Sequence, residues 1–218
     1  MSLQRVPSDI AAHYERVQSY QRDALVVALA AWREVSPARI SESWEARLPV
    51  VATAVASAQI SASESAIIAD GDVRVATGQY ELPEAFVDPE SVAGESSDGG
   101  DLESALYTPA IRAKQAISAG APVAVALDRG RREFDALVRS LVSDAGRKAT
   151  AASFATRLTG GYTRMLNPPS CSRCAILAGR WYRWNDGFRR HPNCDCVHIP
   201  AKSQEWARDE GFVADPYE

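Results

Sequence analysis

All four cysteines of this chain fall within 26 residues near its C-terminal end, and none occurs in the first 170. Two of the three histidines lie in the same window. The complete set is Cys171, Cys174, His191, Cys194, Cys196 and His198. A short region of this kind, rich in turns and aromatic residues, cannot bury enough apolar surface to fold alone. The window therefore predicts a small module that a metal ion holds together.

Thiolate and imidazole groups at this spacing suit a tetrahedral zinc site. Three cysteines are taken as ligands, with one of two residues as the fourth: Cys171, Cys174 and Cys194, then His191 or Cys196. His198 is a less favoured candidate. Four protein ligands leave no open position for water or substrate, so the predicted Zn²⁺ is structural rather than catalytic.

Two other interpretations of the cysteines stay open. Cys171 and Cys174 could form a disulfide or redox pair, or all four cysteines could be reduced structural thiols. A thioredoxin-like redox role would need a βαβ context, and the sequence shows none. No secretory signal is visible at the start of the chain, which predicts a reducing compartment and favours metal binding. The apolar stretch 24–32 is too short to span a bilayer, so no membrane association is expected.

Residues 1–70 predict an N-terminal antiparallel helical hairpin. The first helix is expected from Asp9 to Val35, capped by Ser8, because apolar residues recur there at helical spacing. Ser41 is expected to cap the second helix, and Pro49 to kink or restart it. Asp70-Gly71 is expected to end the pair.

Residues 71–101 predict an acidic loop or linker, because prolines and a Gly/Ser/Asp cluster interrupt them. A helix is expected over 102–118, interrupted at Thr108-Pro109. A longer helix is expected over 123–158, with Gly130 and Gly146 as weak points at which it can split.

From Tyr162 onward, helical periodicity gives way to aromatics, prolines and cysteines. Asp186-Gly187 among aromatic residues indicates a β-hairpin, and a short tail helix is expected over 203–210. The fold class is thus mainly α, with a C-terminal zinc-stapled α+β module. The predicted division is a hairpin over 1–70, a linker over 71–101, a helical plus zinc-knuckle module over 102–200, and a tail over 201–218.

The net charge of −4 conceals two segments of opposite charge. Residues 64–103 hold eleven acidic side chains and one arginine, whereas residues 157–190 hold seven arginines and one aspartate. Those arginines, with two tryptophans, could bind phosphates and stack on bases. We favour the alternative that they cover the aromatic hairpin and pair with the acidic residues 64–103 or with a protein partner. The residues are Arg157, Arg164, Arg173, Arg180, Arg183, Arg189, Arg190, Trp181 and Trp184.

The cysteine window resembles a known family. It contains Cys-x-x-Cys, then Leu-x-Gly-x-x-Tyr, then His-Pro-x-Cys-x-Cys shortly before a proline, over residues 171–200. This combination resembles the MuF-like minor capsid, or head morphogenesis, proteins of tailed bacteriophages. The resemblance covers about residues 150–200. Asp195 stands where the family often has a basic residue, which leaves the metal ligands unaffected.

The resemblance implies a virion protein that associates with the portal or the inner capsid, is present in the host cytoplasm during assembly, and in some cases accompanies the packaged DNA. Some relatives in phages of actinobacteria are identified as capsid maturation proteases, which is the alternative function here. The residues give that alternative little support. No Gly-x-Ser-x-Gly or His-Glu-x-x-His motif is present, and His13 is the one histidine outside the metal window. We therefore expect a structural protein rather than an enzyme.

Overall fold

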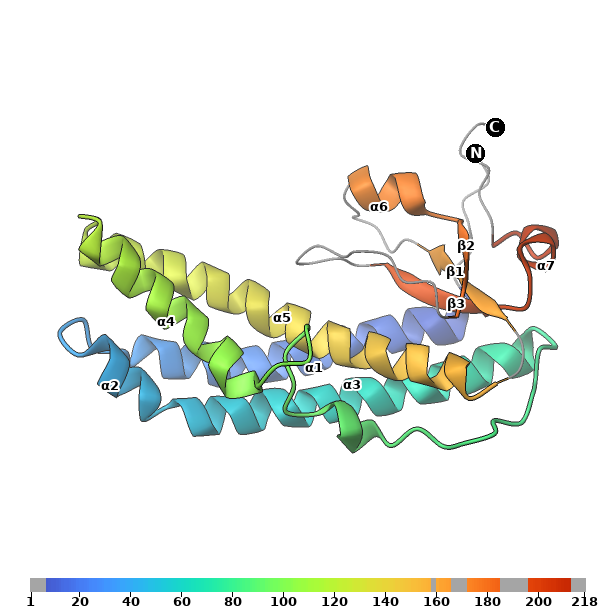
Figure 1. The fold of residues 1–218 in the computed structure, drawn as a ribbon, viewed down its shortest axis with the longest axis horizontal. Helices are drawn as coiled ribbons and strands as arrows, with labels where there is room; N and C mark the ends of the chain where they lie inside the picture. The colour runs from blue at the N-terminus through green and yellow to red at the C-terminus, as the bar shows by residue number, and fades with distance from the viewer. Residues whose placement is uncertain (1–6, 158–159, 166–171, 185–195, 213–218) are drawn as a thin grey trace.

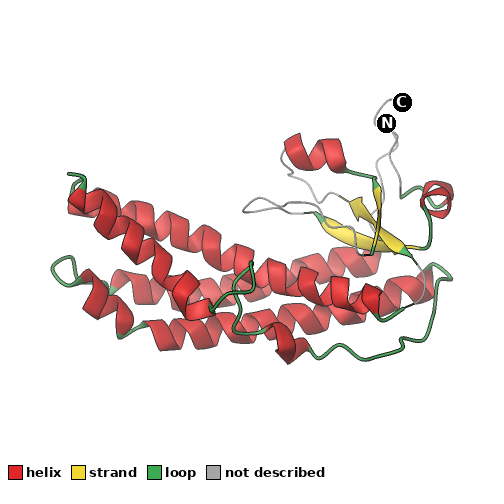
Figure 2. Ribbon diagram, in the orientation of Figure 1, coloured by secondary structure: helices red, strands yellow, loops and turns green. Residues whose placement is uncertain are grey.

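The structure, a computed structural model, describes residues 7–157, 160–165, 172–184 and 196–212, with the backbone alone at 173–175. The described residues are mainly helical, with 67% helix and a small three-stranded antiparallel sheet near the C-terminus. This confirms the predicted mainly α class, while the zinc staple remains a prediction. Figures 1 and 2 show long helices lying side by side, with the sheet on top of one end of them.

The N-terminal hairpin forms from α1 (Ser8–Arg33), a short α2 (Ile40–Glu45) and α3 (Leu48–Ala76). Pro49 restarts the second helix as predicted, because a proline in the first turn lacks only an N–H that has no helical partner there. The two predicted caps are wrong. Ser8 is itself helical and follows Pro7, and Ser41 lies inside α2 after Arg39.

The predicted helix end at Asp70-Gly71 is also wrong, because α3 continues to Ala76. Asp70 is buried and its carboxylate accepts a hydrogen bond from Arg74, one helical turn further on. This local pair and the packing around it outweigh the weak helix propensity of glycine. The helix ends where Gly78 takes a left-handed backbone conformation, with φ of 65°.

The second half of the bundle consists of α4 (Leu102–Ser118) and α5 (Val123–Ala155). The predicted interruption of α4 at Pro109 is wrong, since the buried Leu106, Pro109 and Ala110 anchor the helix against its neighbours. Gly130 does not split α5 either. A methyl group at Gly130 would lie 2.7 Å from Cζ2 of Trp32, so the glycine permits close contact with α1.

The main core lies between α1, α3, α4 and α5. It therefore joins helices from the predicted 1–70 and 102–200 segments. At the end of the bundle that carries α2 and α4, the rings of Trp32, Trp44 and Phe134 pack with centroids 5.0–5.4 Å apart. Helix α3 is long and apolar enough to cross a membrane by length and composition alone; half of that apolar window is buried in the bundle.

The acidic segment between α3 and α4 is a loop, as predicted, with one short 3₁₀ helix, η1 (Pro89–Val92). It returns along the bundle from the end of α3 to the start of α4 (Figure 1). Side chains of the bundle hold its second half in place. Gln59 bonds the backbone of Gly94 and Glu95, and the Lys148 ammonium bonds Glu95 and the carbonyl of Ser96.

The C-terminal sheet has the order β2-β1-β3, with β1 (Gly161–Met165) antiparallel to both β2 (Trp181–Arg183) and β3 (Val197–Ala201). Helix α6 (Ser172–Leu177) precedes β2. The tail helix α7 (Gln204–Asp209) forms as predicted, and Ser203 caps it. In the described residues β2 pairs with β1; the Asp186-Gly187 turn of the predicted hairpin lies outside the described residues.

Candidate functional site at the bundle–sheet junction

The sheet register places the strand ends that flank the two halves of the cysteine window at one end of the sheet. Met165, the last residue of β1, pairs with Val197, the first residue of β3. The chain therefore leaves β1 toward Cys171 and Cys174 at the same end where it enters β3 from Cys196. Two segments that start from one end of a sheet can bring their ligands to a single ion, and a zinc site needs ligands that converge in this way.

The described residues contain only part of the predicted ligand set. Cys196 is buried directly before β3. Cys174 lies in α6, where the backbone alone is described, and Cys171, His191 and Cys194 lie outside the described residues. Within the described residues no cluster of three metal-binding side chains is present. The donor chemistry at Cys196 fits zinc, and the complete ligand set stays a prediction.

His198, the less favoured ligand, is part of an aromatic stack on the sheet. Its ring lies 4.2 Å from the ring of Tyr162, which also stacks on Tyr182 and on Phe154 of α5. The imidazole is nearly fully buried. This stack holds one face of the sheet against the end of α5.

The predicted basic and aromatic contact residues separate into buried and exposed groups. Arg164 is buried in β1, and Arg157 is mostly buried against Asp70. The Trp181 indole donates a hydrogen bond to the Ala201 carbonyl at 2.9 Å. Exposed side chains remain at Arg180, Arg183 and Trp184. The Arg173 side chain, Arg189 and Arg190 lie outside what the structure describes.

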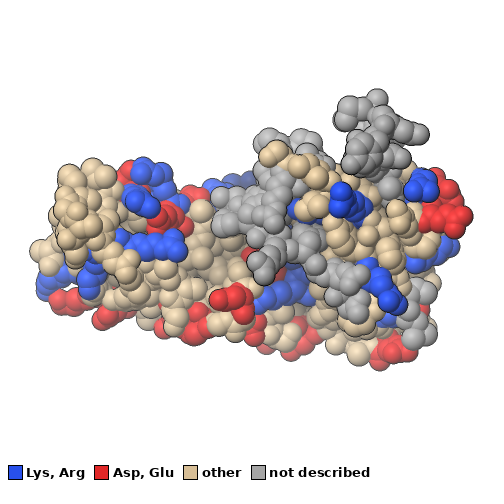
Figure 3. Space-filling model, turned by 45° about the horizontal axis from the view of Figure 1, so that its top comes forward, with Lys and Arg blue, Asp and Glu red and all other residues tan. Residues whose placement is uncertain are grey.

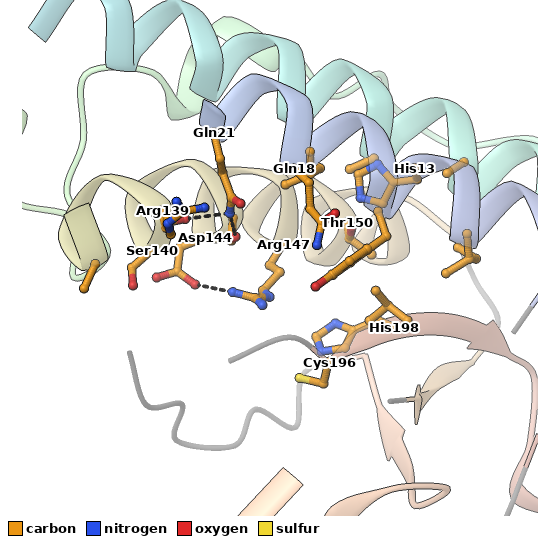
Figure 4. A pocket seen from close by; sticks show the side chains of 18 of the residues that line it. His13, Gln18, Gln21, Arg139, Ser140, Asp144, Arg147, Thr150, Cys196 and His198 are labelled. Atoms are coloured by element: carbon orange, nitrogen blue, oxygen red, sulfur yellow. Dashed lines mark hydrogen bonds and ion pairs between the residues drawn. The ribbon is translucent and has the colours of Figure 1, made fainter. Parts of the chain in front are cut away.

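A cavity of about 570 Å³ lies between α1, α3, α5 and the start of β3. Figure 4 shows polar side chains from the helices facing Cys196, directly before β3, and His198 of β3. The labelled lining residues are His13, Gln18, Gln21, Arg139, Ser140, Asp144, Arg147, Thr150, Cys196 and His198. Several are already engaged: Gln21 donates to Ser143 and to the Arg139 carbonyl, and Arg147 pairs with Asp144 at 2.9 Å.

His13 is the unexpected member of this cavity, since its sequence position predicts only a histidine on the first helix, outside the metal window. Its Nδ1 lies 2.9 Å from Oγ of Ser65 on α3, and Arg16 Nε donates to the same oxygen at 2.8 Å. Burial, followed by the positive charges of Arg16 and Arg147, lowers the pKa of His13 to about 4. The imidazole is therefore neutral at pH 7. Its position on the apolar stripe of α1, between Ile10 and Val17, was the available signal.

A serine hydrogen-bonded to a neutral histidine also occurs in hydrolases, so the His13–Ser65 pair was compared with that geometry. A nucleophilic serine must be open to substrate. Ser65 is 4% exposed on a helix that faces α1, and Arg16 already donates to its Oγ. The pair therefore links two helices and does not present a nucleophile.

A buried ion cluster lies beside the cavity. Asp70 pairs with Arg74 at 2.8 Å and with Arg157 at 3.0 Å, and Ser153 Oγ donates to the same carboxylate at 2.6 Å. The Arg74 guanidinium also lies over the ring of Phe154. One carboxylate thus fixes the ends of α3 and α5 where the sheet packs.

Comparison with known proteins adds no assignment. No protein-family model, no curated protein and no solved structure matches this chain. The function is therefore argued from its own residues.

Proposed function

We propose that this chain is a minor capsid protein of a tailed bacteriophage, which acts in head assembly at the portal or inner capsid. The resemblance of residues 171–200 to the MuF-like proteins supports this assignment. The observation that supports it is the pairing of Met165 with Val197, because the strand ends that flank the two halves of that motif in sequence lie side by side. The role is architectural: the long helices offer contact surface, and the C-terminal module is fixed to one end.

The module is stapled by one structural Zn²⁺. Cys171, Cys174 and Cys194 would hold it with His191 or Cys196. The buried thiol of Cys196 at the start of β3 supports a site at this end of the sheet. A structural zinc contributes about 10–16 kcal/mol to folding in small finger peptides, enough to stabilise a sheet of three short strands.

Capsid maturation protease is the second candidate, and the His13–Ser65 hydrogen bond is the observation in its favour. The burial of Ser65 argues against it. Co-expression with the phage capsid protein separates the two roles. We expect Ser65→Ala and His13→Gln to leave capsid cleavage unchanged; loss of cleavage in both variants would favour the protease.

Zinc analysis of the purified full chain tests the staple. We expect about one Zn²⁺ per chain, which Cys171→Ser or Cys194→Ser removes. His13→Gln, outside the window, serves as the matched control and should retain the metal. Comparing His191→Ala with Cys196→Ser identifies the fourth ligand. A metal-free chain with a folded C-terminal module would contradict the site.

The head role is tested in the phage itself. Deletion of the gene should stop production of infectious, DNA-filled heads, and the chain should be found in purified virions at low copy number. The Cys171→Ser allele should reproduce the deletion, whereas Val26→Ala, an exposed change on α1, should not. Virions that assemble normally without the chain would refute the role.

DNA contact by Arg180, Arg183 and Trp184 is tested separately, by salt-dependent binding to duplex DNA.

A further inference from the structure

An extended acidic arm, residues 80–90, carries apolar side chains into solvent. Phe86 is 94% exposed, Leu82 74% and Tyr80 65%. Single exposed apolar residues are ordinary on a protein surface, but three within seven residues of one extended segment form a patch of the kind that marks an interface.

The arm is fixed to the protein. Before it, the Gln79 side chain bonds the Pro200 carbonyl and the Lys202 N–H at the edge of β3. Within it, the Glu84 N–H bonds the Thr156 carbonyl at the end of α5 at 2.7 Å. These anchors hold the arm along the bundle with its apolar side chains outward. The exposure is therefore built into the fold, and a docked partner would find the arm already ordered.

The charge of the arm restricts the partner. Residues 80–90 contain four acidic side chains and no basic one. Glu84, Asp88 and Glu90 form no ion pair within the described part of the chain. Figure 3 shows acidic side chains along the lower edge of the molecule, with basic ones above them. A fitting partner surface combines exposed apolar groups with unpaired positive charge, which excludes nucleic acid.

The chain itself carries such a surface on α6 and β2. Ile176 is exposed on α6, and Arg180, Arg183 and Trp184 are exposed in β2 or directly next to it in sequence. Neither arginine has an ion-pair partner among the described residues. Strand β2 is also an edge of the described sheet, so its outer side can accept an extended segment. The α6–β2 surface therefore offers apolar side chains, a charge opposite to that of the arm, and an outer strand edge for its extended backbone.

The two surfaces cannot meet within one molecule. The arm follows the underside of the bundle, whereas α6 and β2 lie on the opposite side (Figure 1). We propose that the acidic arm of one copy docks on the α6–β2 surface of a second copy. Such a contact is heterologous, so each copy keeps one free arm and one free surface, and further copies can join head to tail into a ring or chain. The inference depends on these surfaces alone and holds whether or not the chain is a head protein.

Sedimentation of the full zinc-loaded chain tests the proposal, at concentrations up to about 100 µM, where a contact of micromolar affinity is populated. We expect concentration-dependent association that weakens as salt rises, because the charges are exposed. An arm variant, Leu82→Ala with Phe86→Ala, and a surface variant, Arg180→Glu with Arg183→Glu, should each associate at least tenfold more weakly. Val26→Ala and Arg22→Glu, exposed changes on α1, are the matched controls and should behave as the parent chain.

The decisive measurement mixes the two variants. The arm variant retains an intact α6–β2 surface and the surface variant retains an intact arm, so together they can form one contact and no more. We expect a 1:1 dimer from two proteins that are each monomeric. Circular dichroism confirms that both are folded. A parent chain that stays monomeric throughout, or a mixture that forms no dimer, overturns the proposal and leaves the arm to a different protein.

Discussion

The two ends of the helical bundle are stabilised by different kinds of contact. At the end that carries α2 and α4, Trp32, Trp44 and Phe134 form a dry aromatic cluster. At the sheet end, the helices are held by the buried carboxylate of Asp70, and His13 faces a polar cavity. The first end resembles an ordinary hydrophobic core, whereas the second adds specific polar contacts to a smaller apolar cluster around Met165 and Ile199.

This difference explains how the bundle can carry a separate module at a defined position. Apolar packing is tolerant of small rearrangements, since it depends mainly on volume and shape. A buried ion cluster has one good geometry, and a change in either partner leaves a charge unpaired. We infer that the buried ion cluster at the sheet end fixes the orientation of the sheet, while apolar packing, which is most extensive in the main core, supplies most of the stability. Substitutions at the two ends should therefore change the free energy of unfolding by different amounts and with different pH dependence.

The largest effect is expected from Asp70→Asn. The amide removes the charge that Arg74 and Arg157 both contact, and leaves two buried guanidinium groups uncompensated. Breaking a buried ion pair from one side costs about 3–5 kcal/mol. Urea unfolding of Asp70→Asn and of the parent chain measures the loss of unfolding free energy. Asp72→Asn, an exposed change on the same helix, is the control and should lie within about 0.5 kcal/mol of the parent.

A loss below about 1 kcal/mol in Asp70→Asn would contradict the comparison, because the cluster would then contribute no more than an exposed ion pair.

The second effect is a pH dependence confined to the sheet end. The pKa of His13 is lowered from 6.5 to about 4 in the folded chain. The unfolded state therefore takes up a proton between these values while the folded state does not, so stability falls as pH falls from about 6.5 to 4. The loss reaches about 3 kcal/mol at pH 4. Urea unfolding across this range measures it.

His13→Gln separates this contribution from that of the carboxylates. The glutamine does not titrate, so the variant should lose about 3 kcal/mol less than the parent between pH 6.5 and 4. Parallel pH profiles of parent and variant would show that His13 is solvated, and that the sheet end is less buried than the structure has it.

The sequence was a better guide to the aromatic end than to the sheet end. Helix α4 was predicted with its bounds at Leu102 and Ser118, because the signals lie within the helix itself. Gly71 was misread as a stop, since the local Asp70–Arg74 pair that outweighs it depends on burial and on further contacts to Asp70 from Ser153 and Arg157, far along the chain. Strand β1 was not predicted either. Its pairing partners lie about 20 and 40 residues away, and no local pattern reveals them.

The candidate site divides in the same way. The cysteine window was visible because metal ligands have recognisable spacings. The cavity was not, because it requires α1, α5 and β3 to converge. His13 and Ser65 are separated by 52 residues and belong to different helices, so only the packing of α1 on α3 brings them together.

The smallest expected effects come from two glycines and test the packing difference directly. In α5, a methyl group at Gly130 would approach Trp32 Cζ2 to 2.7 Å, which forces the aromatic cluster to shift. At Gly71, in α3 near the sheet end, a methyl group would meet nothing within 4 Å.

Both positions are helical, so alanine gains about 1 kcal/mol of helix propensity at each. Overpacking costs about 1–3 kcal/mol and arises only at Gly130. Thermal unfolding should therefore show that Gly71→Ala is more stable than the parent chain. Gly130→Ala should be less stable than Gly71→Ala by about 1–3 kcal/mol. Equal shifts in the two variants would mean that the aromatic end can yield to an added methyl, and is no more tightly packed than the exposed side of α3.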